Sequence, residues 1–121
     1  MAKRTITIQY DDQGTFAYTD ENGHDARVLH AKAKDSIHWE SEHAFKITFK
    51  YPRSPFETKR RIRTYRSSRR HDDKYPLAKH IVAKPKVKRY LYTVTITDVK
   101  PNAEDDPEIQ IDDTGMNWCQ S

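Results

Sequence analysis

The chain has 121 residues, which suits one domain with a single core and leaves little room for two. Only 35% of the residues are hydrophobic, and no apolar run approaches the length of a membrane span. The single cysteine, Cys119, excludes an internal disulfide and agrees with a reducing compartment. We therefore expect a cytoplasmic protein with no membrane contact.

Short apolar runs with period 2 predict an all-β chain. The clearest run, residues 44–51, alternates aromatic or aliphatic residues with Lys46, Thr48 and Lys50. Residues 57–79 show no such period and predict a long basic loop. The predicted strands are residues 5–10, 15–18, 27–31, 36–40, 44–51, 80–83, 88–97 and 107–112.

Turn signals separate these strands, and nothing in the spacing suggests a βαβ unit. The pattern predicts one antiparallel Greek-key β-sandwich, cupredoxin-like or immunoglobulin-like, over residues 1–112. Residues 113–121 are predicted to form a polar C-terminal tail. The oligomeric state does not follow from the sequence.

Charge is distributed unevenly along the chain. Residues 59–90 hold 13 of the 22 Lys and Arg residues but only 2 of the 18 Asp and Glu residues. The net charge of this segment is +11, and that of the remainder is −7. We expect a local positive potential that attracts phosphates or acidic protein surfaces.

Three segments resemble cupredoxin-like β-sandwiches. Lys34-Asp-Ser-Ile-His-Trp39 resembles the Gly-Asp-x-Val-x-Trp turn and strand of that family, with Lys34 where the family favours Gly. Residues 43–49 followed by Ser54-Pro-Phe56 resemble the next strand and its exit. Residues 90–97 and 106–112 are similar to the closing strands of small bacterial members of unassigned function.

Blue-copper chemistry is not expected to accompany this resemblance. Such a site needs two His, one Cys and usually a Met, with the Cys and the second His close together near the C-terminus. Here no His follows Cys119, and Met116 precedes it. His43 falls near the position of a first copper ligand, but a lone imidazole is not a site. We expect no metal and no cofactor.

The basic segment is the main candidate site. Arginine dominates it, and guanidinium groups suit bidentate contacts with phosphate or carboxylate, while an interspersed tyrosine can stack on a base. The alternatives are a solvated loop for residues 57–79 and a lysine-guarded edge strand for residues 79–89. The candidate binding residues are Lys59, Arg60, Arg61, Arg63, Tyr65, Arg66, Arg69, Arg70, Lys74, Lys86, Lys88 and Arg89.

Signals for catalysis are weak. The chain has three glycines and no phosphate-cradling loop, nucleophile motif or paired catalytic carboxylates. The sequence therefore favours a non-catalytic module that presents an Arg-rich loop to an anionic partner, either nucleic acid or a nucleotide. The alternatives are a protein-interaction module, such as an inhibitor or accessory subunit, docking on an acidic surface, and a small basic ribonuclease that uses His71 or His80 as general base.

Overall fold

The computed structural model describes residues 3–50, 64–81 and 89–111. Those residues form strands and no helix, so this part of the chain holds no helix that could cross a membrane. The strands are β1 (Lys3–Tyr10), β2 (Phe16–Thr19), β3 (Val28–Ala31), β4 (Ser36–Ser41), β5 (Phe45–Phe49), β6 (Thr64–Arg66), β7 (Tyr75–Ile81), β8 (Arg89–Ile96), β9 (Ala103–Asp105) and β10 (Glu108–Ile111).

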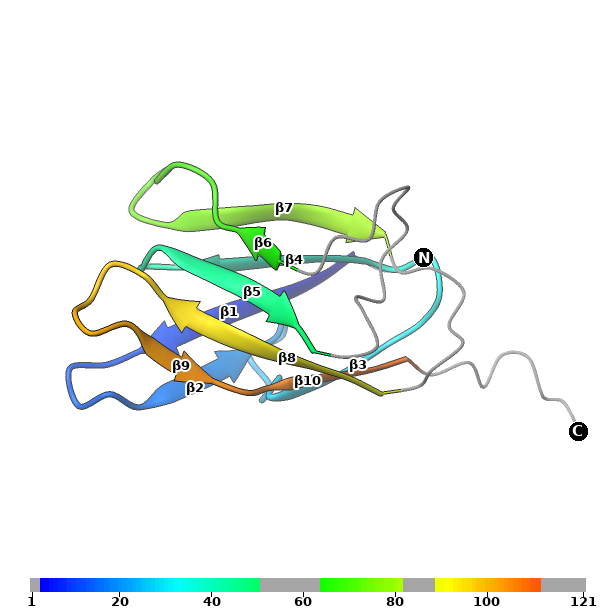
Figure 1. The fold of residues 1–121 in the computed structure, drawn as a ribbon. Helices are drawn as coiled ribbons and strands as arrows, with labels where there is room; N and C mark the ends of the chain where they lie inside the picture. The colour runs from blue at the N-terminus through cyan, green and yellow to red at the C-terminus, as the bar shows by residue number, and fades with distance from the viewer. Residues whose placement is uncertain (1–2, 51–63, 82–88, 112–121) are drawn as a thin grey trace, which may run out of the picture.

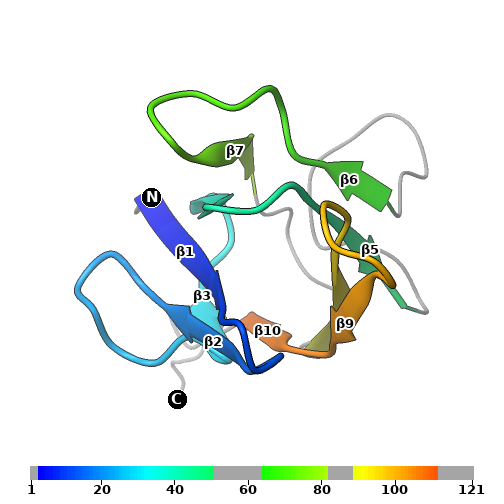
Figure 2. The same cartoon turned by 90° about the vertical axis from the view of Figure 1, so that its left-hand side faces the viewer.

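The strands form two sheets that enclose one core (Figure 1). One sheet has the order β2-β1-β4-β7. The other has the order β3-β10-β8-β5-β6, with β9 added to β8. The view along the strands shows the sheets on either side of a shared interior (Figure 2). The all-β prediction is thus confirmed.

Both sheets are mixed, so the prediction of purely antiparallel pairing is wrong. β1 pairs in parallel with β4, and β10 pairs in parallel with β3. The first case follows from the path of the chain, because β3 lies in the other sheet. The chain then enters β4 beside the start of β1, with Lys3 opposite Ser36.

Alternation of apolar and polar residues explains which side of each strand is buried. In β5, Phe45, Ile47 and Phe49 are buried, while Lys46 and Thr48 face outward. In β8 the buried residues are Tyr90, Tyr92, Val94 and Ile96, with Thr95 buried as well. A half-buried sheet face needs this period of two, which is why these strands were predictable.

The predicted loop of residues 57–79 is wrong at residues 64–66 and 75–79, which form strands, whereas residues 67–74 connect those strands. Residues 64–66 form β6, and β7 begins at Tyr75 rather than at residue 80. Tyr65 and Leu77 are buried and supply the core contacts that hold these short strands. β9 was also missed, because residues 103–105 fall between the predicted strands 88–97 and 107–112. Residues 57–63 and the tail 113–121 lie outside the described residues.

Candidate anion-binding site

Two connections between the sheets run side by side at one end of the molecule (Figures 1 and 2). One links β4 to β5, and the other, residues 67–74, links β6 to β7. Backbone hydrogen bonds hold the second connection in place: Ser67 N–H donates to Phe45 O at 2.9 Å, and Ser68 N–H donates to Pro76 O at 2.7 Å. The basic residues of this connection are therefore carried by a folded turn.

Within that connection the predicted residues differ in their surroundings. Arg66, at the end of β6, and Arg69 are exposed. Arg70 is also exposed and lies 3.0 Å from the Asp73 carboxylate. Lys74 Nζ donates to Glu40 Oε2 at 2.9 Å, and this hydrogen bond raises the pKa of Lys74. The charge of Lys74 is thus already balanced by a carboxylate, whereas Arg66 and Arg69 form no ion pair with any of the described residues.

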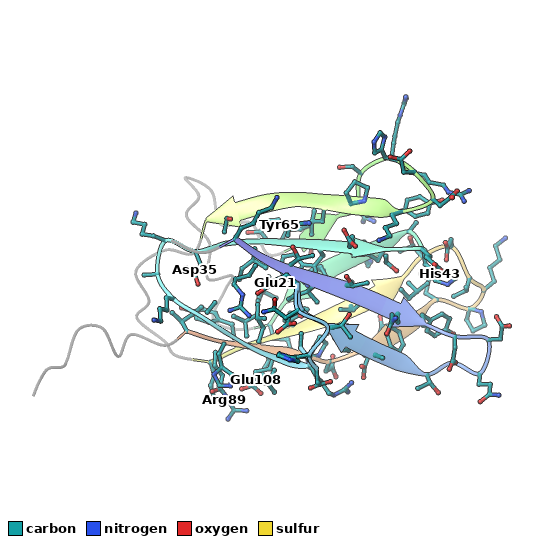
Figure 3. All side chains as sticks on the ribbon, turned by 180° about the vertical axis from the view of Figure 1, so that it is seen from behind. Glu21, Asp35, His43, Tyr65, Arg89 and Glu108 are labelled. Carbon is teal, nitrogen blue, oxygen red and sulfur yellow. The ribbon has the colours of Figure 1, made fainter. Side chains whose placement is uncertain are left out.

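Arg89 lies at the far end of its strand from this turn. Lys46 of β5 pairs with Arg66 of β6 on one side and with Thr95 of β8 on the other. Arg89 lies six residues before Thr95 along β8. At about 3.3 Å per residue this separation is roughly 20 Å. Arg89 makes two hydrogen bonds to Glu108, at 2.8 and 3.0 Å. Figure 3 shows the two side chains together, away from His43 at the opposite end. Arg89 and the turn therefore do not form one surface, although the sequence places both among the candidate binding residues.

Tyr65 is a correction to the predicted site. Its side chain is only 7% exposed and belongs to the core cluster. Its ring meets Phe49 edge to face, with centroids 6.1 Å apart. A ring in this position is not presented for stacking on a base. The remaining predicted residues, Lys59, Arg60, Arg61, Arg63, Lys86 and Lys88, lie outside the described residues.

Lys46 is a basic residue that the predicted site lacked. It stands directly opposite Arg66 in the β5–β6 ladder, and both alternate with inward-facing residues. Like charges directly opposite each other destabilise a sheet. No ion pair between described residues involves Lys46 or Arg66 to offset that cost. The outward position of Lys46 was predictable from its strand, but its pairing with Arg66 depends on a register that sequence does not reveal.

Two threonines form the next pair along the same strands. Thr48 is opposite Thr64, and their hydroxyl oxygens are 3.2 Å apart. We call Lys46, Thr48, Thr64 and Arg66 together the β5–β6 patch. Ammonium, guanidinium and hydroxyl groups all donate hydrogen bonds, so the β5–β6 patch is suited to oxygen atoms of an anion.

A second feature at this end is an open groove of about 480 Å³, lined in part by Tyr10, Glu42, His43 and Lys74. His43 Nδ1 lies 3.1 Å from Asp98 Oδ1, and Ala44 N–H donates to the other oxygen of Asp98 at 2.9 Å. Asp98 thereby fixes the connection from β4 to β5. The geometry gives the His43 ring a structural partner in Asp98, and the His43 backbone N–H donates to Ser41 Oγ at 3.2 Å.

His71, a candidate general base of the ribonuclease alternative, lies on an exposed turn. His71 is 82% exposed on its side chain and lies 3.3 Å from Asp72, its sequence neighbour. Among the described residues, no group of three or more His, Cys, Asp or Glu side chains is arranged to hold a metal ion. Cys119 and Met116 lie outside those residues. Comparison with protein-family models and with curated proteins finds no match to this chain.

Proposed function

We propose that this protein is a non-catalytic binding module whose partner is nucleic acid or a nucleotide. It contacts the partner through the β5–β6 patch and through Arg69 in the turn that follows. The observation that carries the proposal is the pairing of Lys46 with Arg66 on the outer side of the sheet, where no ion pair between described residues involves either side chain. A bound anion supplies that missing charge.

The cost of this pairing supports a binding role. Lysine and arginine directly opposite each other repel, and many neutral residues would fit an exposed strand position equally well. Other described cations nearby are arranged differently. Lys50 lies 3.3 Å from Asp106, and Lys74 lies 2.9 Å from Glu40. The contrast favours a function for the uncompensated pair over simple solubility.

The composition of the β5–β6 patch favours phosphate over an acidic protein surface. Protein interfaces concentrate their binding energy in buried aromatic or apolar anchors. The outward side chains of the β5–β6 patch are charged or hydroxylated, and Tyr65 points into the core. Contacts of Arg, Lys and Thr with phosphate oxygens are typical of nucleic-acid backbones.

Salt dependence of oligonucleotide binding tests the proposal. We expect the logarithm of the affinity to fall linearly with the logarithm of the salt concentration. Lys46→Gln, Arg66→Gln and Arg69→Gln should each weaken binding and reduce that slope by about one, without changing sequence preference. Fluorescence anisotropy at several salt concentrations measures both quantities.

Arg89→Gln is the matched control, because it removes an arginine that is paired with Glu108 at the other end of β8. It should leave affinity and slope nearly unchanged. Absence of binding at low salt to both an oligonucleotide and a mononucleotide would refute the proposal. Equal losses in the Arg66 and Arg89 variants would show that net charge, rather than the β5–β6 patch, drives binding.

For the fold, we propose a Greek-key sandwich of the cupredoxin-like kind. The chain changes sheets between β2 and β3, β3 and β4, β4 and β5, β6 and β7, and β7 and β8, which agrees with Greek-key connections. Lys34 has φ of 73°, a left-handed conformation that glycine adopts most easily. This supports the resemblance, since Lys34 stands where that family favours Gly.

A further inference from the structure

We infer that the β5–β6 patch receives one terminal phosphate, a phosphomonoester on a nucleotide or at the end of an oligonucleotide. This inference rests on the proposed function and specifies which chemical group of the partner is bound. The competing ligand chemistry is the phosphodiester of a continuous backbone. Three features favour the terminal group: the spacing of the donors, their charge, and the carboxylate contacts that the neighbouring donors already make.

The donors lie within a surface the size of one phosphate. Directly opposite residues in an antiparallel pair have Cβ atoms about 4.5–5.5 Å apart. Lys46 and Arg66 form one such pair. Thr48 and Thr64 form the next outward-facing pair, two residues or about 7 Å further along the strands. The hydroxyl contact of 3.2 Å shows that the two threonine side chains already converge. The long side chains of Lys46 and Arg66, and the one threonine hydroxyl proton that this contact leaves over, can thus donate to one group above β5 and β6.

The charge of the β5–β6 patch matches a monoester better than a diester. A phosphomonoester carries about −1.5 to −2 at pH 7, because its second pKa is about 6. A backbone phosphodiester carries a single negative charge. Lys46 and Arg66 supply two positive charges, and no ion pair between described residues uses either one. A terminal phosphate neutralises both charges, whereas a diester leaves one of them uncompensated.

The surrounding described cations do not extend the β5–β6 patch into a track along β5. The next outward lysine on that side, Lys50, lies 3.3 Å from Asp106. Thr93, across the sheet from Thr48, donates its hydroxyl to the same carboxylate at 2.8 Å. Lys50 and Thr93, the donors on which a second phosphate would depend, therefore already interact with Asp106. Arg69 remains available beyond β6 for a further contact with the same ligand.

Oligonucleotides of one sequence that differ only at their ends provide the test. One carries a 5′-phosphate, one a 3′-phosphate, and one has hydroxyl groups at both ends. At constant ionic strength we expect at least one phosphorylated form to bind about tenfold more tightly than the unphosphorylated form, as measured by anisotropy. Adenosine 5′-monophosphate, used as competitor, shows which source of the phosphate the protein binds. Strong displacement of the oligonucleotide indicates a free nucleotide, and weak displacement indicates a chain end.

Variants assign the preference to the β5–β6 patch. Lys46→Gln, Arg66→Gln and the double change Thr48→Val with Thr64→Val should each reduce the tenfold preference. Lys50→Gln is the matched control on the same strand and should retain it. Equal affinity for all three oligonucleotides, with losses in the Lys46 and Arg66 variants, would overturn this inference and leave the proposed function intact. If neither the oligonucleotides nor adenosine 5′-monophosphate binds, both are wrong.

Discussion

At the scale of single residues, one carboxylate ties together three separate parts of the chain. Arg27 donates two hydrogen bonds to Asp105, at 2.7 and 2.8 Å, and the Tyr18 hydroxyl donates a third at 3.0 Å. Partial burial raises the pKa of Asp105, but the hydrogen bonds from Arg27 and Tyr18, a backbone hydrogen bond and the positive charge of Arg27 together outweigh this effect and hold the pKa below its ordinary value. The ionised form is therefore favoured by folding.

This network predicts a pH dependence of stability. A carboxylate whose pKa is lower in the folded state contributes its full stabilisation above its unfolded pKa of about 3.9 and loses it as the pH falls through the lower, folded pKa. Asp105→Asn should lower the free energy of unfolding by about 1–3 kcal/mol at pH 7. Below about pH 4 the difference from wild type should shrink. Urea unfolding between pH 7 and pH 2 measures it.

Asp12→Asn, a change at an exposed position of the β1–β2 turn, is the control and should leave stability nearly unchanged at every pH. A deficit in the Asp105 variant that stayed constant down to pH 2 would show that the residue acts through packing rather than through its charge.

At the scale of elements, periodicity decided what could be predicted. Strands β1, β4, β5 and β8 have at least two buried residues in alternation, and their positions were predicted to within two residues. β6 and β9 have three residues each, too few to show a period. β7 was placed late because Pro76 interrupts its pattern, although proline is tolerated in a strand at the edge of a sheet.

The candidate site was predictable in residue type but not in arrangement. Arg66 and Arg69 belong to the arginine-rich segment, and Lys46 was placed on the outward side of its strand. Only the register between β5 and β6 joins Lys46 to Arg66. That register is a contact between residues twenty positions apart, set by the burial of Tyr65 and Ile47. Because Tyr65 is buried, its ring is not available to the candidate site.

The β5–β6 ladder gives a prediction about stability. Lys46→Glu places opposite charges across from each other, so the free energy of unfolding should rise by about 0.2–1 kcal/mol, while anion binding is lost. Chemical denaturation and anisotropy measure the two effects. Lys50→Glu is the control: it sets a second acid beside Asp106 and should lower stability. A Lys46→Glu protein less stable than wild type would mean that the lysine has a structural role.

At the scale of the whole molecule, aromatic contacts join the two sheets into one core. Trp39 lies in β4 of the four-stranded sheet and is fully buried. Its ring centroid is 6.5 Å from Phe49 and 5.7 Å from Tyr92, which belong to β5 and β8 of the other sheet. Because these rings pack across the interior, neither sheet keeps its inner side covered if the other unfolds.

This shared core predicts one cooperative unfolding transition. The chain has two tryptophans, so Trp118→Phe leaves Trp39 as the single indole reporter of the interior. Urea unfolding followed by Trp39 fluorescence and by far-UV circular dichroism should then give coincident curves. In the same background, Tyr92→Ala should lower the free energy of unfolding by about 3–5 kcal/mol and shift both curves equally, although Tyr92 and Trp39 lie in different sheets. Separate midpoints for the two signals would show that the sheets unfold independently, and the interior would then not be a single core.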